Sequence, residues 1–314
     1  AAALLPGRAG GSGVGRISTI RADTDLAREA RSRLPESPVW SDAQRAHGGA
    51  TMPLYRRHRE SVFAILQFAA LAIGLVWLTV AGAAQMGYNW QWYRVPEYIV
   101  RVHEDGLLWG PLALGFVETI RLSAISFVLT VMLGIVVAVL RLSRSPVGRA
   151  TATVYIELIR NTPLLVQLYI VYFVLAPLVG LDRYWTAILC LTLFEAAFAA
   201  EIFRGGIMGV ARGQWEAAAS LGLTRLQAYR DIILPQAVRL VLPPLTGLAV
   251  SLVKHSSIVS VIAVFELTTE GRNIISDTYM AFEIWLTVAA MYLAITVSLS
   301  LVAAWLEKRL AVTT

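Results

Sequence analysis

Cysteine, histidine and charged side chains are all scarce in this sequence. It has one cysteine, Cys190, and four scattered histidines, His47, His58, His103 and His255. Neither a disulfide framework nor a clustered zinc site can be assembled from so few ligands, so we expect no metal site. Only 15% of the residues are charged, whereas 57% are apolar. Soluble proteins carry about a quarter charged residues, which argues against a soluble enzyme.

Lysine is scarcer still. The 27 basic residues exceed the 21 acidic ones, but the only lysines are Lys254 and Lys308, followed by His255 and Arg309. A phosphate-binding P-loop needs a lysine followed by serine or threonine, so the chain cannot be a conventional P-loop ATPase. The arginines are strung between long apolar runs and not gathered on one face. This distribution indicates membrane topology and no nucleic-acid partner.

Long apolar runs set the fold class. About 20 apolar helical residues cross a hydrocarbon core, because a helix satisfies its own backbone hydrogen bonds in lipid. We therefore predict an all-α, polytopic membrane protein with six transmembrane helices. The predicted spans are Ser61–Ala84, Leu122–Leu140, Asn161–Leu181, Tyr184–Phe203, Leu240–Phe265 and Ile284–Leu306.

Positive charge in the short loops predicts the orientation, since cytoplasmic loops accumulate Arg and Lys. If the segment before the first span lies in the cytoplasm, fourteen basic loop residues lie on the cytoplasmic side of the membrane and four on the other side. Both termini are then cytoplasmic.

The chain before and between these spans divides by composition. We expect residues 1–58 to be a disordered cytoplasmic tail, with Met52 as a possible native start. An additional N-terminal transmembrane helix follows at 59–84, then an extracytoplasmic, aromatic-rich connection at 85–110. The connection is either an interfacial aromatic belt or a docking surface. Pro96 should start a short helix there that Gly106 ends.

The loop between the fourth and fifth spans is too ordered for a linker. Residues 213–221 are helix-forming, and Gly222 stands where the end of a helix needs a positive φ. Thr224 and Gln227 have the spacing of a capping box, which starts a second helix. Pro235 should stop that second helix. The pattern predicts two short helices joined by a tight bend.

This loop resembles the coupling loop of type I importer permeases of the ATP-binding-cassette (ABC) class. Their pattern is E-A-A, three residues, G, nine residues, I-x-L-P, and it is matched in full. The resemblance implies a short helix seated in a cytoplasmic ABC ATPase subunit, which binds ATP and Mg, so that this chain itself holds no cofactor. The structural alternative is a re-entrant or interfacial hairpin. The implied ATPase-coupling residues are Gly213, Glu216, Ala217, Ala218, Gly222, Ile232, Leu234 and Pro235.

Blocks at 155–167, 201–207, 216–237 and 254–262 resemble the polar amino-acid branch of these permeases, for histidine, glutamate, glutamine, arginine or opines. This implies a bacterial inner-membrane protein whose five-helix permease core, residues 111–310, pairs with an identical or different second permease subunit. It also implies an extracytoplasmic amino-acid-binding protein as partner. The motif residues expected to have structural roles are Arg160, Thr162, Pro163, Gln167, Glu201 and Arg204.

Lys254 is the basic residue well inside an apolar span, and an ionisable group there is a functional candidate. We expect Lys254, Ser256, Ser257 and Glu195 to line the substrate passage, with Lys254 meeting the α-carboxylate of the amino acid. The alternative is a buried pair of Lys254 with Glu195 or Glu201 that only ties helices together.

Charged and polar residues also gather at the presumed outer end of the fifth span. They suit a zwitterionic solute; the alternative is that they are solvated loop charges or contacts to a binding protein. Near the second span, Glu118 and Arg121 have the spacing of a simple ion pair. The residues at the outer end of the fifth span are Glu266, Thr268, Thr269, Glu270 and Arg272.

The function that follows is the membrane-spanning permease subunit of an ATP-driven importer of a polar amino acid, and not an enzyme. An ion-gradient-driven secondary transporter of small zwitterionic solutes is the alternative, although no internal repeat of the kind common in such carriers is evident. Dependence on a separate ATPase and a binding protein separates the two.

Overall fold

The computed structural model describes residues 54–310 apart from 86, 104 and 105. These described residues fall into two units, one up to Tyr88 and one from Asn89 onward. The first unit contains helix α3, Leu54–Gln85, which starts earlier than the 59–84 helix expected from sequence. Its stretch Phe63–Gly82 is long and apolar enough to cross a membrane. Residues 1–53 of the expected tail, 1–58, lie outside the described residues, and residues 54–58 belong to α3 instead of the tail.

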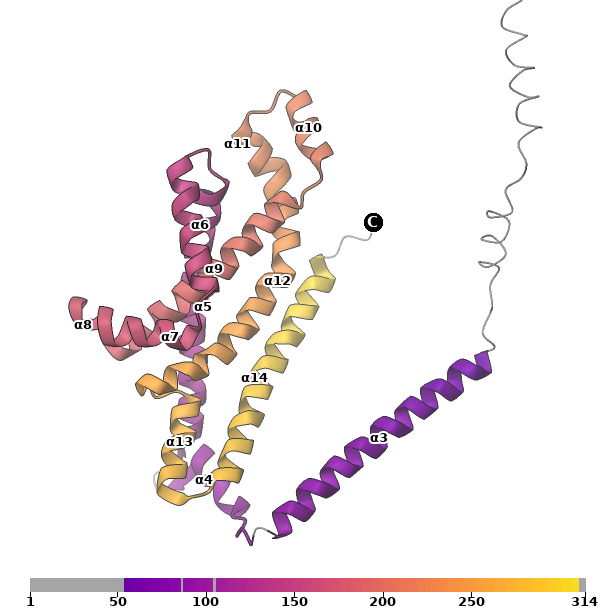
Figure 1. Ribbon diagram of the computed structural model, residues 1–314, viewed down its shortest axis with the longest axis vertical. Helices are drawn as coiled ribbons and strands as arrows, with labels where there is room; N and C mark the ends of the chain where they lie inside the picture. Colours follow the sequence, from indigo (N-terminus) through magenta and orange to yellow (C-terminus); the bar gives the residue numbers. More distant parts are fainter. Residues whose placement is uncertain (1–53, 86, 104–105, 311–314) are drawn as a thin grey trace, which may run out of the picture. The chain divides into compact units, whose positions relative to one another are not determined.

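The second unit is a helical bundle with one small hairpin (Figure 1). In chain order its elements are η1 (Trp92–Arg94), α4 (Val95–Ile99), β1 (Val100–His103), β2 (Gly106–Trp109), α5 (Pro111–Leu142), α6 (Pro146–Arg160), α7 (Leu164–Tyr169), η2 (Ile170–Leu175), α8 (Ala176–Val179), α9 (Arg183–Met208), α10 (Arg212–Ser220), α11 (Arg225–Gln227), η3 (Ala228–Ile233), α12 (Leu234–His255), η4 (Ser256–Ile262), α13 (Leu267–Thr278) and α14 (Ala281–Leu310).

Five helical stretches among the described residues are long and apolar enough to cross a membrane: in α3, α5, α9, α14 and the run Arg225–Ile262. The predicted third span, Asn161–Leu181, differs from these. Its helical part, Leu164–Val179, reaches the required length only together with α6, and the two are bent by 106°. Pro163 causes the break, because a proline disfavours helical backbone in the residue before it. Six spans are present if this broken pair counts as one.

Small side chains bring α5 and α9 close together. A Cβ added to Gly134 of α5 would lie 2.7 Å from the Cβ of Ala199. Ala196, Ala197 and Ala200 of α9 are also buried. Close backbone approach through small residues is the usual way membrane helices associate. This pair forms the centre of the unit.

α4 and α13 lie at one end of the bundle (Figure 1). This end has its own apolar core. α4 has Pro96 in its first turn, as predicted, but it ends at Ile99 and not at Gly106. The chain instead forms an antiparallel hairpin in which Val100 lies opposite Trp109. Gly106 has a φ of 125°, which glycine adopts readily. The all-α prediction missed this hairpin. The core residues are Val95, Tyr98, Leu112, Leu267, Ile274, Met280, Ile284 and Val288.

Candidate functional site

The segment that carries the coupling motif folds as a compact elbow, residues 212–233, at the end of the bundle opposite α13 (Figure 1). Its first arm, α10, ends in a Schellman motif. The backbone N–H of Leu223 donates to the carbonyl of Ala218 at 3.1 Å, and the N–H of Gly222 donates to Ala219 at 3.0 Å. Gly222 has a φ of 69°, so the predicted positive φ is confirmed.

The second arm begins with the predicted capping box. The backbone N–H of Thr224 donates to Oε1 of Gln227 at 2.9 Å, and the N–H of Gln227 donates back to the Thr224 hydroxyl at 3.4 Å. Side-chain packing then fixes the angle between the arms, since the rings of Trp215 and Tyr229 meet edge to face at 5.2 Å. Beneath them Ile233 is fully buried. The elbow therefore has a core of its own.

The prediction that Pro235 stops the second helix is wrong. The helix continues through Pro235 to His255, the last residue of α12. The preceding turns, η3, form a π-helix in which the N–H of Leu234 donates to Tyr229, five residues back. This wider turn accommodates a proline, which lacks an N–H and would clash in a regular α-helix. The elbow is thus continuous with a membrane-spanning helix.

The predicted coupling residues divide between the elbow's surface and its core. Glu216, Ala217 and Gly222 are exposed, as is Gly213, whereas Ala218 is buried. Further along, Ile232 packs against the elbow's core, while Leu234 and Pro235 are exposed.

Sequence reasoning missed two side chains on the same surface. Leu221 and Leu226, beside the Gly222 turn, are 74% and 78% exposed. Among the described residues the Glu216 carboxylate has no ion pair or hydrogen bond. The tip therefore presents a free carboxylate and two leucines to whatever it contacts.

The motif around Gln167 holds the bend between α6 and α7. The side-chain amide of Gln167 donates to the carbonyl of Ile159 at 2.8 Å, to the carbonyl of Thr162 at 3.1 Å and to the Thr162 hydroxyl at 2.7 Å. Pro163 is the residue before the first turn of α7. Arg160 is exposed, with its guanidinium over the ring of Phe198 at 5.4 Å. Thr162, Pro163 and Gln167 therefore lie together at this corner.

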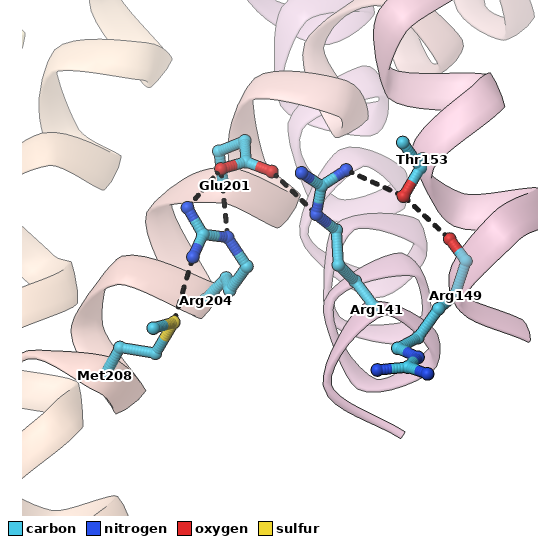
Figure 2. Close-up of polar contacts among 6 residues, drawn as sticks. All are labelled: Arg141, Arg149, Thr153, Glu201, Arg204 and Met208. Carbon is cyan, nitrogen blue, oxygen red and sulfur yellow. Dashed lines mark hydrogen bonds and ion pairs between the residues drawn. The ribbon is translucent and has the colours of Figure 1, made fainter. Parts of the chain in front are cut away.

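A second motif pair, Glu201 and Arg204, lies near the C-terminal end of α9. Figure 2 shows this pair together with Arg141. Arg204 donates to Oε2 of Glu201 through Nε at 3.0 Å and through a terminal nitrogen at 2.7 Å. The other carboxylate oxygen faces Nε of Arg141 at 3.4 Å, and Arg141 also donates to the hydroxyl of Thr153 at 3.2 Å. Glu201 therefore links α9 to α5 and, through Arg141, to α6. Sequence reasoning missed Arg141.

Glu195 of α9 is 2% exposed, and its partner is His255. Phe194 packs edge to face against the His255 ring at 5.5 Å. His255 comes from the end of α12, so this pair fastens the middle of one span to another. The only sequence feature that pointed to this pair was the position of His255 next to Lys254.

The other residues assigned to the passage do not join Glu195. Lys254 is exposed, and the alternative pair with Glu195 or Glu201 is not found among the described residues, where both carboxylates have other partners. Ser256 is buried and its hydroxyl donates to the carbonyl of Val253; the Ser257 hydroxyl donates to Lys254. Both serines therefore close the end of α12 through local bonds.

The charged residues after the fifth span are not all solvated. Glu266 is fully buried and caps α13, with its carboxylate accepting from the N–H of Thr268 at 2.8 Å and of Thr269 at 2.9 Å. The hydroxyl of Tyr292 donates to the same carboxylate at 2.7 Å. Burial raises the pKa of Glu266, although these hydrogen bonds oppose the shift.

The relatives and the solved structure that this chain resembles are components of amino-acid ABC transporters. The probable glutamine ABC transporter permease GlnM of Bacillus subtilis is 41% identical over 198 residues, which are 62% of this chain and 91% of the relative. The glutamine transport system permease GlnP of Escherichia coli K12 is 34% identical over 62% of this chain and 90% of its own length. A crystal structure of an amino acid ABC transporter with histidines superposes with a TM-score of 0.61 at 35% identity, covering 63% of this chain and 94% of that one.

The family described as binding-protein-dependent transport system inner membrane component matches residues 130–312, which include the elbow, the Glu201 pair and the Glu195–His255 contact. The chain belongs to this family of inner-membrane ABC transporter permeases.

Proposed function

We propose that the chain is the permease subunit of an ABC importer that carries a polar amino acid across a bacterial inner membrane. The elbow is the observation that carries the proposal. Two arms are fixed by a Schellman motif, a capping box and an aromatic contact, and the second arm is continuous with α12. A rigid arm joined directly to a spanning helix transmits a push from outside the membrane into it. The glutamine permeases among its relatives support the choice of cargo class.

In this proposal, a separate ATPase binds ATP and Mg, and the chain itself catalyses nothing. The exposed carboxylate of Glu216 pairs with a basic group or a backbone N–H of the ATPase, while Leu221 and Leu226 supply apolar contact. The elbow then lies on the cytoplasmic side, in agreement with the Arg-rich loops. Both termini are cytoplasmic in that orientation.

The other partners are a second permease subunit and an extracytoplasmic binding protein that delivers the amino acid. Within the chain, we assign the solute's carboxylate to Lys254, whose ammonium has no ion pair among the described residues. Ser256, Ser257 and Glu195 are the remaining passage residues of this proposal. Membrane-embedded charge left unpaired by protein is costly unless a polar ligand or water meets it.

Uptake by the reconstituted complex tests the proposal. The chain, with its ATPase and its binding protein, is placed in liposomes, and uptake of radiolabelled glutamine, arginine, histidine, glutamate and octopine is followed with and without internal ATP. We expect uptake of one of these to need ATP and both partners. Concentrative uptake by the chain alone under an ion gradient would overturn the proposal in favour of a secondary carrier.

Two charge substitutions test the roles within the chain. Glu216→Lys should abolish uptake while Glu97→Lys, an exposed glutamate of α4 at the opposite end, should not. Lys254→Met should change the concentration dependence of uptake, whereas Lys308→Met near the end of α14 should leave it unchanged. Wild-type uptake kinetics in Lys254→Met would remove Lys254 from the passage.

A further inference from the structure

A cavity of about 750 Å³ opens at the end of the bundle that holds α13. Its walls come from α5, the first turn of α9, the segment before α13, α13 itself and the hairpin strand β2. The apolar core beneath it joins α4, α5, α13 and α14, so the walls are held by packed elements. Neither the passage residues nor the elbow belong to this cavity.

Three aromatic rings line the cavity: Trp109, Tyr184 and Phe265. The guanidinium of Arg183 lies over the Phe265 ring at 5.7 Å, and that of Arg121 lies over the Tyr184 ring at 6.0 Å. Trp109 is 68% exposed and has no ring or cation contact among the described residues. Aromatic faces attract cations, and indole does so most strongly, so one face of the cavity is free for a cation.

Two carboxylates face the same space, Glu118 of α5 and Glu270 of α13. Gly115 brings them onto one wall, because a Cβ at Gly115 would lie 3.0 Å from Cγ of Glu270, and Gly115 is on the same face of α5 as Glu118. Glu270 has no ion pair among the described residues, and burial together with the neighbouring Glu266 raises its pKa. A cation beside it would offset both effects.

The nearby arginines neutralise little of the negative charge of Glu118 and Glu270. The guanidinium of Arg183 is turned to the backbone, donating to the carbonyl of Ala263 at 3.2 Å. Arg121 lies 3.8 Å from Glu118, but its side chain is 67% exposed. Pairs of this kind are weak and are readily exchanged for another cation.

We propose that this cavity is a binding site for an ammonium or guanidinium group, held by Glu118 and Glu270 and covered by the ring of Trp109. The group comes from a free amino-acid solute or from a basic side chain of the binding protein. Either source presents the same chemistry to the cavity. Only the identity of the source rests on the proposed function, since binding of a cation does not require transport.

Agmatine is a suitable probe, because it carries an ammonium and a guanidinium but no carboxylate. Binding of radiolabelled agmatine to the full chain in lipid nanodiscs is measured by equilibrium dialysis, with glutarate as the anionic comparison. We expect saturable agmatine binding and no glutarate binding. Glu118→Gln combined with Glu270→Gln should weaken agmatine binding about tenfold or more, since charge-assisted contacts are lost. Glu97→Gln, an exposed glutamate outside the cavity, is the matched control.

Trp109→Ala provides an independent variant, because this exposed side chain can be removed without opening a core. It should weaken agmatine binding about threefold or more, since the cation loses its aromatic cover. Thermal unfolding of every variant shows whether a loss of binding reflects a loss of folding. Saturable agmatine binding that is equally strong in the wild type, the double glutamine variant and Trp109→Ala would overturn the proposal.

A second measurement decides between the two sources of the cation. It follows the association of the binding protein with the nanodisc-embedded chain. Agmatine binding together with unchanged association of the binding protein in the double glutamine variant identifies a solute site. Loss of that association in the double glutamine variant assigns the cation to the binding protein, whether or not free agmatine binds. The absence of both effects overturns the site. ATP-dependent uptake is measured separately, so failure of the site and failure of the importer assignment are distinguishable.

Discussion

Nδ1 of His255, at the end of α12, lies 2.5 Å from Oε1 of Glu195, in the middle of α9. The two side chains differ in exposure, since that of His255 is 38% exposed and that of Glu195 only 3%. Removing one partner therefore has unequal consequences. A histidine left alone still reaches water, whereas a carboxylate left alone remains buried.

We predict that His255→Leu destabilises the protein more than Glu195→Leu does. Removing the partner of a buried charge typically costs about 3–5 kcal/mol, and His255→Leu leaves such a charge. The double variant should recover most of the loss, because neither side chain is then left without its partner. Thermal unfolding in detergent with matched lipid checks the order. Equal losses in the two single variants would contradict this account of the pair.

Gln167 gives a second prediction. Gln167→Leu removes three donated hydrogen bonds that close the corner between α6 and α7. The carbonyls of Ile159 and Thr162 lose their side-chain donor, at a cost of about 1–3 kcal/mol. We expect lower thermal stability and a wider spread of spin-label distances between α6 and α8.

Asn161→Ala is the control for this corner. Asn161 caps the end of α6 and is exposed, and among the described residues its side chain bonds only to Glu157 in the last turn of that helix. Asn161→Ala should leave the thermal stability and the spin-label distances near those of the wild type. A Gln167→Leu variant with unchanged label distances would show that Pro163 alone sets the bend.

The elbow was predictable from the sequence because its parts obey local rules. A glycine after a helix, and a threonine three residues before a glutamine, give the same caps in many surroundings, and Gly222 and Thr224 have the predicted geometry. Pro235 was misread since its effect depends on the turn before it. A π-helical turn has no clear signal in a single sequence.

The third span and the partner of Glu195 could not be predicted for a different reason. Apolar composition indicated a span at Asn161–Leu181, but the direction of that segment depends on the contacts of Gln167. Glu195 and His255 are separated by 60 residues, and no spacing rule connects them. The hairpin at Val100 was likewise missed, since two strands of four residues give a weak periodic signal.

Gly222 and Gly213 form a matched pair within the elbow. Gly222→Ala places a side chain at a φ of 69°, which costs about 1–2 kcal/mol. Gly213→Ala adds a methyl group to a helical site where nothing lies within 4 Å, and should stabilise the arm by about 0.5–1 kcal/mol. Amide hydrogen exchange across α10 should therefore quicken in the first variant and slow in the second. Changes of the same sign in both would contradict the assigned turn geometry.

Glu266 makes stability depend on pH in a direction fixed by its burial. Because burial raises the pKa of Glu266 above its ordinary value, the folded protein holds this proton more tightly than the unfolded chain. The resulting stabilisation is complete below the ordinary carboxyl pKa of about 4.3 and is lost as the pH rises through the folded value. The neighbouring Glu270, whose pKa is also raised, acts in the same direction.

Glu266→Gln cannot titrate, so its melting temperature should fall less than that of the wild type as the pH rises through this window. Glu97→Gln, which removes an exposed carboxyl outside α13, should keep the wild-type slope. Melting temperatures of the three proteins between pH 4 and pH 8 provide the measurement. Parallel curves for the wild type and Glu266→Gln would mean that the hydrogen bonds from Thr268, Thr269 and Tyr292 fully offset burial in setting this pKa.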